Sequence, residues 1–204
     1  MYTIYDYQNP ERSLYMQKQL EIEFKSLLTK DEYDRLIEKF SGNRISTQTN
    51  HYFDTPRFSL KASEVALRVR ERDNFEITLK RKKRYAMVEH NILISSDEFY
   101  RFKEDGTIPS DEIKNEIYDI IGQQKLVNFL SLTTHRMSFP YKKGTLAIDK
   151  SEFLGVTDYE IEYEAKSYAS GKKEFIEIIT ELDFVYKKSE QKIKRAYAAY
   201  RRLV

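Results

Sequence analysis

A five-residue stretch near the N-terminus, Glu21-Ile22-Glu23-Phe24-Lys25, has residue types and a spacing that could do chemistry. In a β-strand, every second side chain lies on the same face. Glu21, Glu23 and Lys25 would therefore project together, while the two apolar residues face the other way. Two carboxylates can bind a divalent cation, and an ammonium group can bind a phosphate. The same pattern also occurs on strands whose charged face lies in water, so this stretch alone leaves both interpretations open.

The same alternation of apolar and charged residues recurs later in the chain, at residues 65–72, 75–82, 136–139 and 160–164. The charges are sorted between these segments: the first two are mainly basic and the last is acidic. Each segment fits a strand with one apolar face and one charged face. The sequence therefore predicts several strands of this kind, with acids and bases on different strands.

The elements that position these residues follow from spacing and from turn and cap signals. We expect strands near residues 19–27, 44–53, 64–73, 74–82, 87–94, 132–140, 145–150 and 157–165. We expect helices after the capping signals at Thr29, Ser95 and Ser110, and near residues 123–130, 171–182 and 189–204. An antiparallel sheet of about eight strands can be open, with its charged face in water, or closed around a charged and hydrated interior. A closed barrel of this size has room for one small ligand.

Composition restricts the class of protein. The chain has 204 residues, of which 40% are hydrophobic and 33% charged, with a net charge of +2. This balance suits a globular domain and creates no overall field that would attract DNA or a membrane. The absence of cysteine excludes disulfides, thiolate zinc sites and cysteine nucleophiles.

The ends and apolar runs of the chain also carry information. No apolar run approaches the roughly 18 residues of a membrane span, and the N-terminus lacks a signal-peptide pattern. We therefore expect a cytoplasmic protein. We expect one domain over residues 16–204, preceded by a polar N-terminal extension of residues 1–15.

Taken together, these segments resemble the CYTH superfamily, the triphosphate tunnel metalloenzymes. The stretch from Glu21 to Lys25 is similar to the ExExK signature of that family. Further similar segments follow in the family's order: Tyr52–Thr55 (YxDT), Leu67–Arg70, Thr78–Lys80, Thr134–Arg136 (TxR), Leu146–Asp149 (LxxD), Phe153–Glu162 (ending in ExE) and Gln191–Ala196 (SKYxRA). The likeness extends over about residues 17 to 200, and is greatest to small bacterial CYTH-domain proteins of the YjbK type.

The resemblance implies a fold and an activity. The implied fold is α+β: a closed eight-stranded antiparallel β-barrel, or tunnel, with a charged interior and flanking α-helices. Members of the family act on triphosphate compounds with Mg²⁺ or Mn²⁺. Their activities include hydrolysis of inorganic triphosphate, hydrolysis of thiamine triphosphate, RNA 5′-triphosphatase activity and class IV adenylyl cyclase activity.

The resemblance also implies a set of site residues. The side chains expected to bind phosphate are Lys25, Arg68, Arg70, Lys80, Arg136 and Lys192. The side chains expected to bind the metal are Glu21, Glu23, Asp149, Glu160 and Glu162, with Glu89 as a further candidate. The chain has no glycine-rich phosphate loop, so side chains must bind the phosphates. The three histidines lack ligand spacing, and we expect no zinc site.

The expected reaction is in-line attack of water on the terminal phosphoryl group, with Lys25 as the catalytic candidate that contacts the attacking water. Two alternatives stay open: a class IV-type adenylyl cyclase, and a non-catalytic module that binds polyphosphate or nucleotide. The expected partner is a small-molecule triphosphate, with no membrane or nucleic acid, and the expected assembly is a monomer or a homodimer.

Overall fold

The computed structural model describes residues 22–83 and 86–203, with side chains over residues 22–81 and 88–203. The strands are β1 (Ile22–Leu28), β2 (Ile45–Asp54), β3 (Val65–Glu71), β4 (Phe75–Lys83), β5 (Ala86–Ile94), β6 (Val127–Tyr141), β7 (Gly144–Phe153) and β8 (Val156–Ala165). The helices are α1 (Lys30–Lys39), α2 (Ser59–Ala62), α3 (Ser96–Asp105), α4 (Asp111–Ile121), α5 (Tyr168–Glu181) and α6 (Lys192–Tyr200). The predicted extension of residues 1–15 and the metal candidate Glu21 lie outside the described residues.

The strands follow the order β1-β8-β7-β6-β2-β3-β4-β5 in an eight-stranded sheet. Neighbouring strands pair antiparallel, as in β1 with β8 and β3 with β4. The predicted fold class, an eight-stranded antiparallel sheet with flanking helices, is confirmed. In the described part of the chain, β1 and β5 are the two edge strands of this order. Main-chain pairing between β1 and β5 is not among the described strand pairings.

The chain divides into two compact units, which we describe separately. Among the described residues, unit 1 comprises residues 49–83 and 86–131, and unit 2 comprises residues 22–48 and 132–203. Strands β2 and β6 run from one unit into the other. The single domain expected over residues 16–204 stays a prediction.

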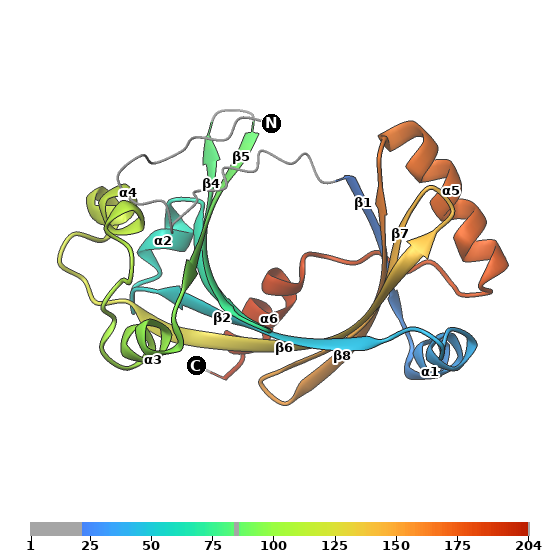
Figure 1. Cartoon of the computed structure of the whole chain (residues 1–204), viewed down its shortest axis with the longest axis horizontal. Helices are drawn as coiled ribbons and strands as arrows, with labels where there is room; N and C mark the ends of the chain where they lie inside the picture. Colours follow the sequence, from blue (N-terminus) through green and yellow to red (C-terminus); the bar gives the residue numbers. More distant parts are fainter. Residues whose placement is uncertain (1–21, 84–85, 204) are drawn as a thin grey trace. The chain divides into compact units, whose positions relative to one another are not determined.

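Unit 1 has an apolar face of its strands covered by helices. Leu67, Val69, Ile77 and Leu79 on β3 and β4 are buried with Phe99 and Phe102 of α3 and Ile113 and Ile117 of α4. Figure 1 shows α2, α3 and α4 on one side of these strands. Because side chains alternate along a strand, the residues between these apolar ones face the other way. Those residues include Arg68, Arg70, Thr78 and Lys80.

Unit 2 is built on the same principle. Met137, Ile148, Ile161 and Tyr163 of the strands pack with Leu36 of α1 and with Phe175 and Ile178 of α5. Figure 1 shows α1 and α5 on one side of these strands and α6 on the other. Helix α6 therefore lies on the face that carries the charged residues of β6, β7 and β8.

Local signals predicted the helix starts correctly. Thr29 and Glu32 form a reciprocal capping box at α1, and Ser95 and Glu98 form another at α3. The Ser110 hydroxyl caps α4 by accepting from the main-chain N–H of Ile113. These caps satisfy N–H groups that the first helical turn leaves without partners.

One predicted element is wrong. We expected a helix over residues 123–130, but β6 already begins at Val127 and continues to Tyr141. Leu130, Leu132 and Thr134 are buried while Ser131 is exposed, which is the period-two pattern of a strand. Pairing within the sheet, rather than the local preference of the sequence, decides the structure of this segment.

Among the described residues, no helix is long and apolar enough to cross a membrane.

Candidate active site

The centre of the charged face in unit 2 is the ammonium group of Lys192, at the start of α6. Its Nζ lies 2.8 Å from Asp149 Oδ2, 2.6 Å from Glu160 Oε2 and 2.5 Å from Glu162 Oε1. Asp149 and Glu160 are directly opposite each other on β7 and β8, and both are fully buried. Three carboxylates from two neighbouring strands thus converge on a single cationic position.

Arg136 on β6 holds the same carboxylates from another side. Its Nε donates to Asp149 Oδ1 at 2.8 Å, and its Nη2 donates to Asp149 Oδ2 at 2.6 Å and also to Glu162. The register places Arg136 opposite Asp149, which produces this bidentate geometry. Lys192, Arg136, Asp149, Glu160 and Glu162 are defined here as the ionic cluster.

Mutual charges fix the ionisation of Glu162, Lys192 and Arg136. Burial alone would raise the pKa of Glu162, but the charges of Lys192 and Arg136 lower that pKa to about 2. Burial alone would lower the pKa of Lys192, but Asp149, Glu162 and Glu160 raise that pKa above its ordinary value. Desolvation also opposes the charge on Arg136, yet its contacts with Asp149 raise its pKa. All three groups therefore stay ionised around neutral pH.

Strand β1 adds a carboxylate and an ammonium group at the edge of the cluster. Lys25 forms an ion pair with Glu23, and its Nζ lies 3.9 Å from Glu162 Oε1. Burial and the charge of Glu162 raise the pKa of Glu23, although Lys25 opposes both. Glu23 is therefore a partly desolvated carboxylate with a second carboxylate, Glu162, nearby.

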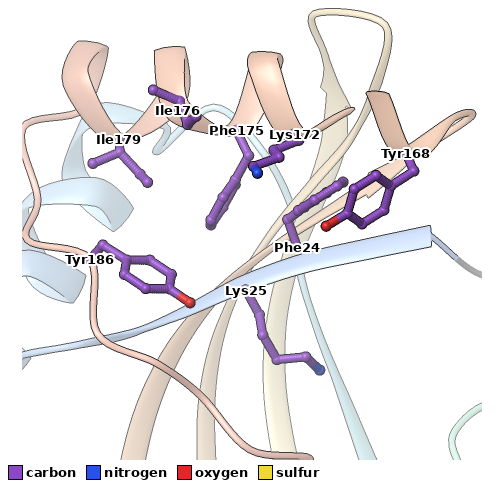
Figure 2. Close-up of a pocket in the computed structure, with 8 residues that line it drawn as sticks. All are labelled: Phe24, Lys25, Tyr168, Lys172, Phe175, Ile176, Ile179 and Tyr186. Atoms are coloured by element: carbon purple, nitrogen blue, oxygen red, sulfur yellow. The ribbon is translucent and has the colours of Figure 1, made fainter. Parts of the chain in front are cut away.

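The other face of β1 carries a cavity of about 310 Å³ beneath α5. Figure 2 shows Phe24 directed toward α5 and Lys25 directed away from it. The ring of Phe24 lies 5.4 Å from that of Tyr168 and 5.9 Å from that of Phe175. The predicted alternation along β1 is therefore confirmed for these two residues, although Lys25 also contributes to the lining of the cavity.

A second layer of contacts surrounds Glu160. Arg195 of α6 donates from Nη2 to Glu160 Oε2 at 3.1 Å and from Nε to Asp158 Oδ2 at 2.8 Å. The Ser189 hydroxyl also donates to Glu160. We had not placed Arg195, Ser189 or Asp158 in the site. Two signals were available for Arg195: it lies in the family-like segment Gln191–Ala196, and it follows Lys192 by three residues on one helix, so both can face the same strand.

Unit 1 carries the other predicted phosphate-binding residues on the polar face of β3 and β4. Lys80 pairs with Glu89 on the neighbouring strand β5, and Arg70 Nη1 lies 3.7 Å from Glu76 Oε1. Burial and the charge of Arg68 lower the pKa of Arg70. The Nε atoms of Arg68 and Arg70 are buried and have no hydrogen-bond partner within the described residues. Two guanidinium groups are thus incompletely satisfied.

One segment of the family pattern has a structural role here. The carboxylate of Asp54 accepts from the main-chain N–H groups of Thr55, Leu60 and Lys61 at 2.7, 2.9 and 3.0 Å. Asp54 is buried and fixes the turn from β2 into α2. The Thr55 hydroxyl accepts from Ser59 N at 3.0 Å and supports the same turn.

The three histidines also have fixed partners. His51 contacts Ser131 Oγ at 2.9 Å and Glu71 Oε2 at 3.0 Å, His90 contacts Glu116, and His135 contacts Glu152 at 3.0 Å. Burial lowers the pKa of His51, although the neighbouring Glu71 opposes this shift.

Within residues 22–81 and 88–203, no three acidic, histidine or cysteine side chains are arranged as a metal site. The carboxylates of the ionic cluster instead surround Lys192 and Arg136.

The structure therefore brings together, within unit 2, seven of the predicted residues: Glu23, Lys25, Arg136, Asp149, Glu160, Glu162 and Lys192. It places the other four described candidates on one face of unit 1: Arg68, Arg70, Lys80 and Glu89.

Comparison with known proteins shows the family of this chain. The model of the CYTH domain family matches residues 19–197. The chain belongs to the CYTH domain family. It is 30% identical over 194 residues to the Bacillus subtilis (strain 168) protein named "Putative triphosphatase YjbK", and the match covers 93% of this chain and all of that protein.

Solved CYTH-like structures have the same fold. A structure from Bacillus halodurans, named as a "putative adenylate cyclase", is 34% identical with a TM-score of 0.75, over 87% of this chain and 97% of that one. A Hippeastrum protein described as a "putative adenylyl cyclase" with a dominant triphosphatase activity is 21% identical with a TM-score of 0.70, over 90% of this chain and 96% of that one. At this identity the second likeness shows the fold alone.

Proposed function

We propose that this CYTH protein is a metal-dependent hydrolase that cleaves the terminal phosphoryl group of inorganic triphosphate or of a small organic triphosphate such as thiamine triphosphate. The observation that carries the proposal is the ionic cluster, in which cations and carboxylates alternate on one buried face. The similarity to the B. subtilis protein named "Putative triphosphatase YjbK" supports the same reaction class.

The basic residues suit a polyphosphate chain. Arginine offers a planar pair of donors to phosphoryl oxygens, and lysine offers a compact charge. Arg136, Lys192 and Lys25 supply these groups in unit 2, and Arg68, Arg70 and Lys80 supply them in unit 1. We assign all six to phosphate binding. Arg68 and Arg70 suit this role best, because each has a buried donor that no described protein acceptor uses.

The carboxylates have the oxygen donors that Mg²⁺ and Mn²⁺ prefer. Glu23 is the best-placed described candidate, because it lies close enough to Glu162 for that carboxylate to raise its pKa, so two carboxylates meet at this position. Glu21, Asp149, Glu160 and Glu162 complete the proposed set. Glu89, paired with Lys80 in unit 1, is the weakest candidate on this geometry. When bound, a divalent cation would polarise a phosphoryl oxygen and offset its charge.

The reaction asks the protein mainly for positioning and charge stabilisation. The guanidinium and ammonium groups would hold the nonbridging oxygens and offset the negative charge that develops as the terminal phosphoryl group leaves. Lys25, at the edge of the ionic cluster, would hydrogen-bond and orient the attacking water. The ion pairs that Arg136 and Lys192 already make keep their side chains in place before substrate binds.

A second candidate function is adenylyl cyclase activity, which the name of the B. halodurans structure favours. That reaction needs attack by the ribose 3′-hydroxyl and releases pyrophosphate, whereas hydrolysis releases phosphate. The two reactions therefore differ in their products. Binding without turnover would indicate the third alternative, a polyphosphate- or nucleotide-binding module.

The test incubates purified protein with Mg²⁺ or Mn²⁺ and separately with inorganic triphosphate, thiamine triphosphate and ATP, and then resolves the products. We expect free phosphate from at least one substrate and none with EDTA. The double variant Glu21→Gln and Glu23→Gln should lose metal-dependent turnover. Glu177→Gln, on α5 and paired with Lys142 rather than with the ionic cluster, serves as the matched control and should retain it. Unchanged rates in the double variant, or cyclic AMP as the main product, would contradict the proposal.

Partner and compartment follow from the same proposal. We propose a small-molecule triphosphate as the partner and the cytoplasm as the compartment, since the chain has no cysteine and suits a reducing environment.

A further inference from the structure

Four buried polar atoms on the polar face of unit 1 have no hydrogen-bond partner among the described residues. They are Asn50 Oδ1, Arg68 Nε, Arg70 Nε and Thr78 Oγ1. The exposed fraction of Asn50 is 6% and that of Thr78 is 1%, so both neutral side chains are withdrawn from bulk water. Buried polar groups in native proteins nearly always have partners, and each exception requires an explanation.

The four atoms belong to one continuous patch. On the β2–β3 ladder, Asn50 is directly opposite Arg70, and on the β3–β4 ladder, Arg68 is directly opposite Thr78. Residues directly opposite each other share a face and have Cβ atoms about 5 Å apart. Arg68 and Arg70 are two residues apart on β3, so they also share that face. The unpartnered atoms thus gather across three adjacent strands.

Within the part of the chain that the structure describes, the buried side-chain atoms that have no partner are those of this patch. Farther along the same face, Lys80 forms an ion pair with Glu89. The outer end of Arg70 lies near Glu76, while its Nε does not find an acceptor in the described chain. The charged groups at the margins of this face therefore have partners, whereas the Nε donors of Arg68 and Arg70, the hydroxyl of Thr78 and the amide oxygen of Asn50 have none among the described residues.

The chemistry of the patch suits an anion with several acceptor oxygens. The two Nε–H groups can only donate, and the threonine hydroxyl can donate. The amide of Asn50 presents its nitrogen at the same place after a half-turn, because the two amide atoms are interchangeable in outline. All four groups can therefore donate to one oxyanion, two as cations and two as neutral groups.

We propose that Asn50 and Thr78 are substrate-positioning residues that, with Arg68 and Arg70, form a subsite for one phosphoryl group of the triphosphate. This inference rests on the proposed function. The arginines supply charge, and the two neutral side chains fix the orientation of the phosphoryl oxygens. A hydroxyl donating to a charged oxygen makes a stronger bond than one donating to a neutral group.

Thr78→Val tests the assignment because valine keeps the shape of threonine and removes only the hydroxyl. We expect it to raise the KM for inorganic triphosphate in the presence of Mg²⁺ by about tenfold, with a smaller change in kcat. Thr78→Ser should restore a KM within about twofold of the wild-type value, because it returns the hydroxyl. Thr157→Val, an exposed strand position in unit 2, is the matched control and should leave the KM unchanged.

A purely structural role gives the opposite pattern. Because the Thr78 hydroxyl has no described partner, Thr78→Val should leave the melting temperature of the ligand-free protein unchanged or slightly higher. A lower melting temperature together with an unchanged KM would overturn the inference. Asn50→Leu is the second variant and should also raise the KM, without a change in the Mg²⁺ concentration needed for half-maximal activity.

The same measurements separate this inference from the proposed function. If the wild-type protein neither binds nor hydrolyses inorganic triphosphate, the proposed function fails and the subsite fails with it. If the wild type hydrolyses triphosphate while Thr78→Val and Asn50→Leu keep the wild-type KM, the proposed function stands and only the subsite is overturned.

Discussion

In unit 2 the buried charges are paired with one another, whereas in unit 1 the arginines of β3 keep donors that no described group accepts. Lys192 alone contacts three carboxylates, and Arg136 contacts two. Arg68, by comparison, has a buried Nε without a partner. Both faces belong to the same kind of strand, with one apolar and one polar side, so the difference lies in the choice of polar residues.

Under the proposed function, the two faces divide stability and ligand binding between them. A buried ion costs several kcal/mol of desolvation, which a partner must offset. In unit 2 these partners are carboxylates of the protein itself. The cations there therefore stabilise the fold and also face the proposed site. In unit 1 the offset is incomplete, so the arginines have bonding capacity left for a ligand. Substitutions in the two units should therefore have different consequences.

Lys192→Met should give the largest effect on stability. The change leaves Asp149, Glu160 and Glu162 buried with one cation fewer, and removing one partner from a buried ionic network typically costs about 3–5 kcal/mol. Urea denaturation of the metal-free protein measures this free energy of unfolding. Lys194→Met, an exposed position on the same helix, is the control. A loss below about 1 kcal/mol would show that the cluster is not held together by Lys192.

Arg68→Met should separate function from stability. Since the buried Nε of Arg68 has no described partner, we expect the free energy of unfolding to change by less than about 1 kcal/mol. We expect kcat/KM for triphosphate to fall by about 100-fold, as for the loss of one charged group that stabilises the transition state. Arg101→Met, exposed on α3, is the control. A large loss of stability with little loss of activity would reverse our assignment of the two faces.

How much of this arrangement the sequence predicted depends on whether each signal involves neighbouring residues or residues far apart in the chain. Alternation over two residues correctly placed Phe24 and Lys25 on opposite faces of β1, and a capping box correctly placed the start of α1. These signals are local and need no knowledge of the partner. The strand that replaces the expected helix at residues 123–130 is formed through pairing with distant residues, which a short window does not contain.

The site shows the same limit. The charged residues were identifiable because charge at strand spacing is conspicuous and because the segments resemble a family. Arg195 lies in the family-like segment Gln191–Ala196 but was not assigned to the site, because its contacts with Glu160 and Asp158 are visible only in the folded chain. Asn50 and Thr78 are ordinary strand residues in the sequence. They become candidates only because their buried polar atoms have no partner among the described residues, and this is visible only in the folded chain.

Glu32 extends the comparison to acid pH and should give the smallest of the three effects. Its carboxylate accepts from the main-chain N–H groups of Thr29 and Val185 at 2.6 and 3.1 Å and from Lys187 Nζ at 2.9 Å. Burial alone would raise the pKa of Glu32, but these hydrogen bonds lower it from 4.5 to about 2. A charge in unit 2 is again matched by fixed partners.

The sign of the pH effect follows from that shift. Because the pKa of Glu32 is lower in the folded state, its contribution to stability is complete above about pH 5 and is lost as the pH falls toward 2. Over that interval we expect the wild type to lose about 2 kcal/mol of unfolding free energy more than Glu32→Gln, as measured by urea denaturation. Glu38→Gln, exposed on the same helix, should retain the wild-type acid sensitivity. Parallel curves for the wild type and Glu32→Gln would mean that this carboxylate is not the one that ties α1 to the segment around Val185.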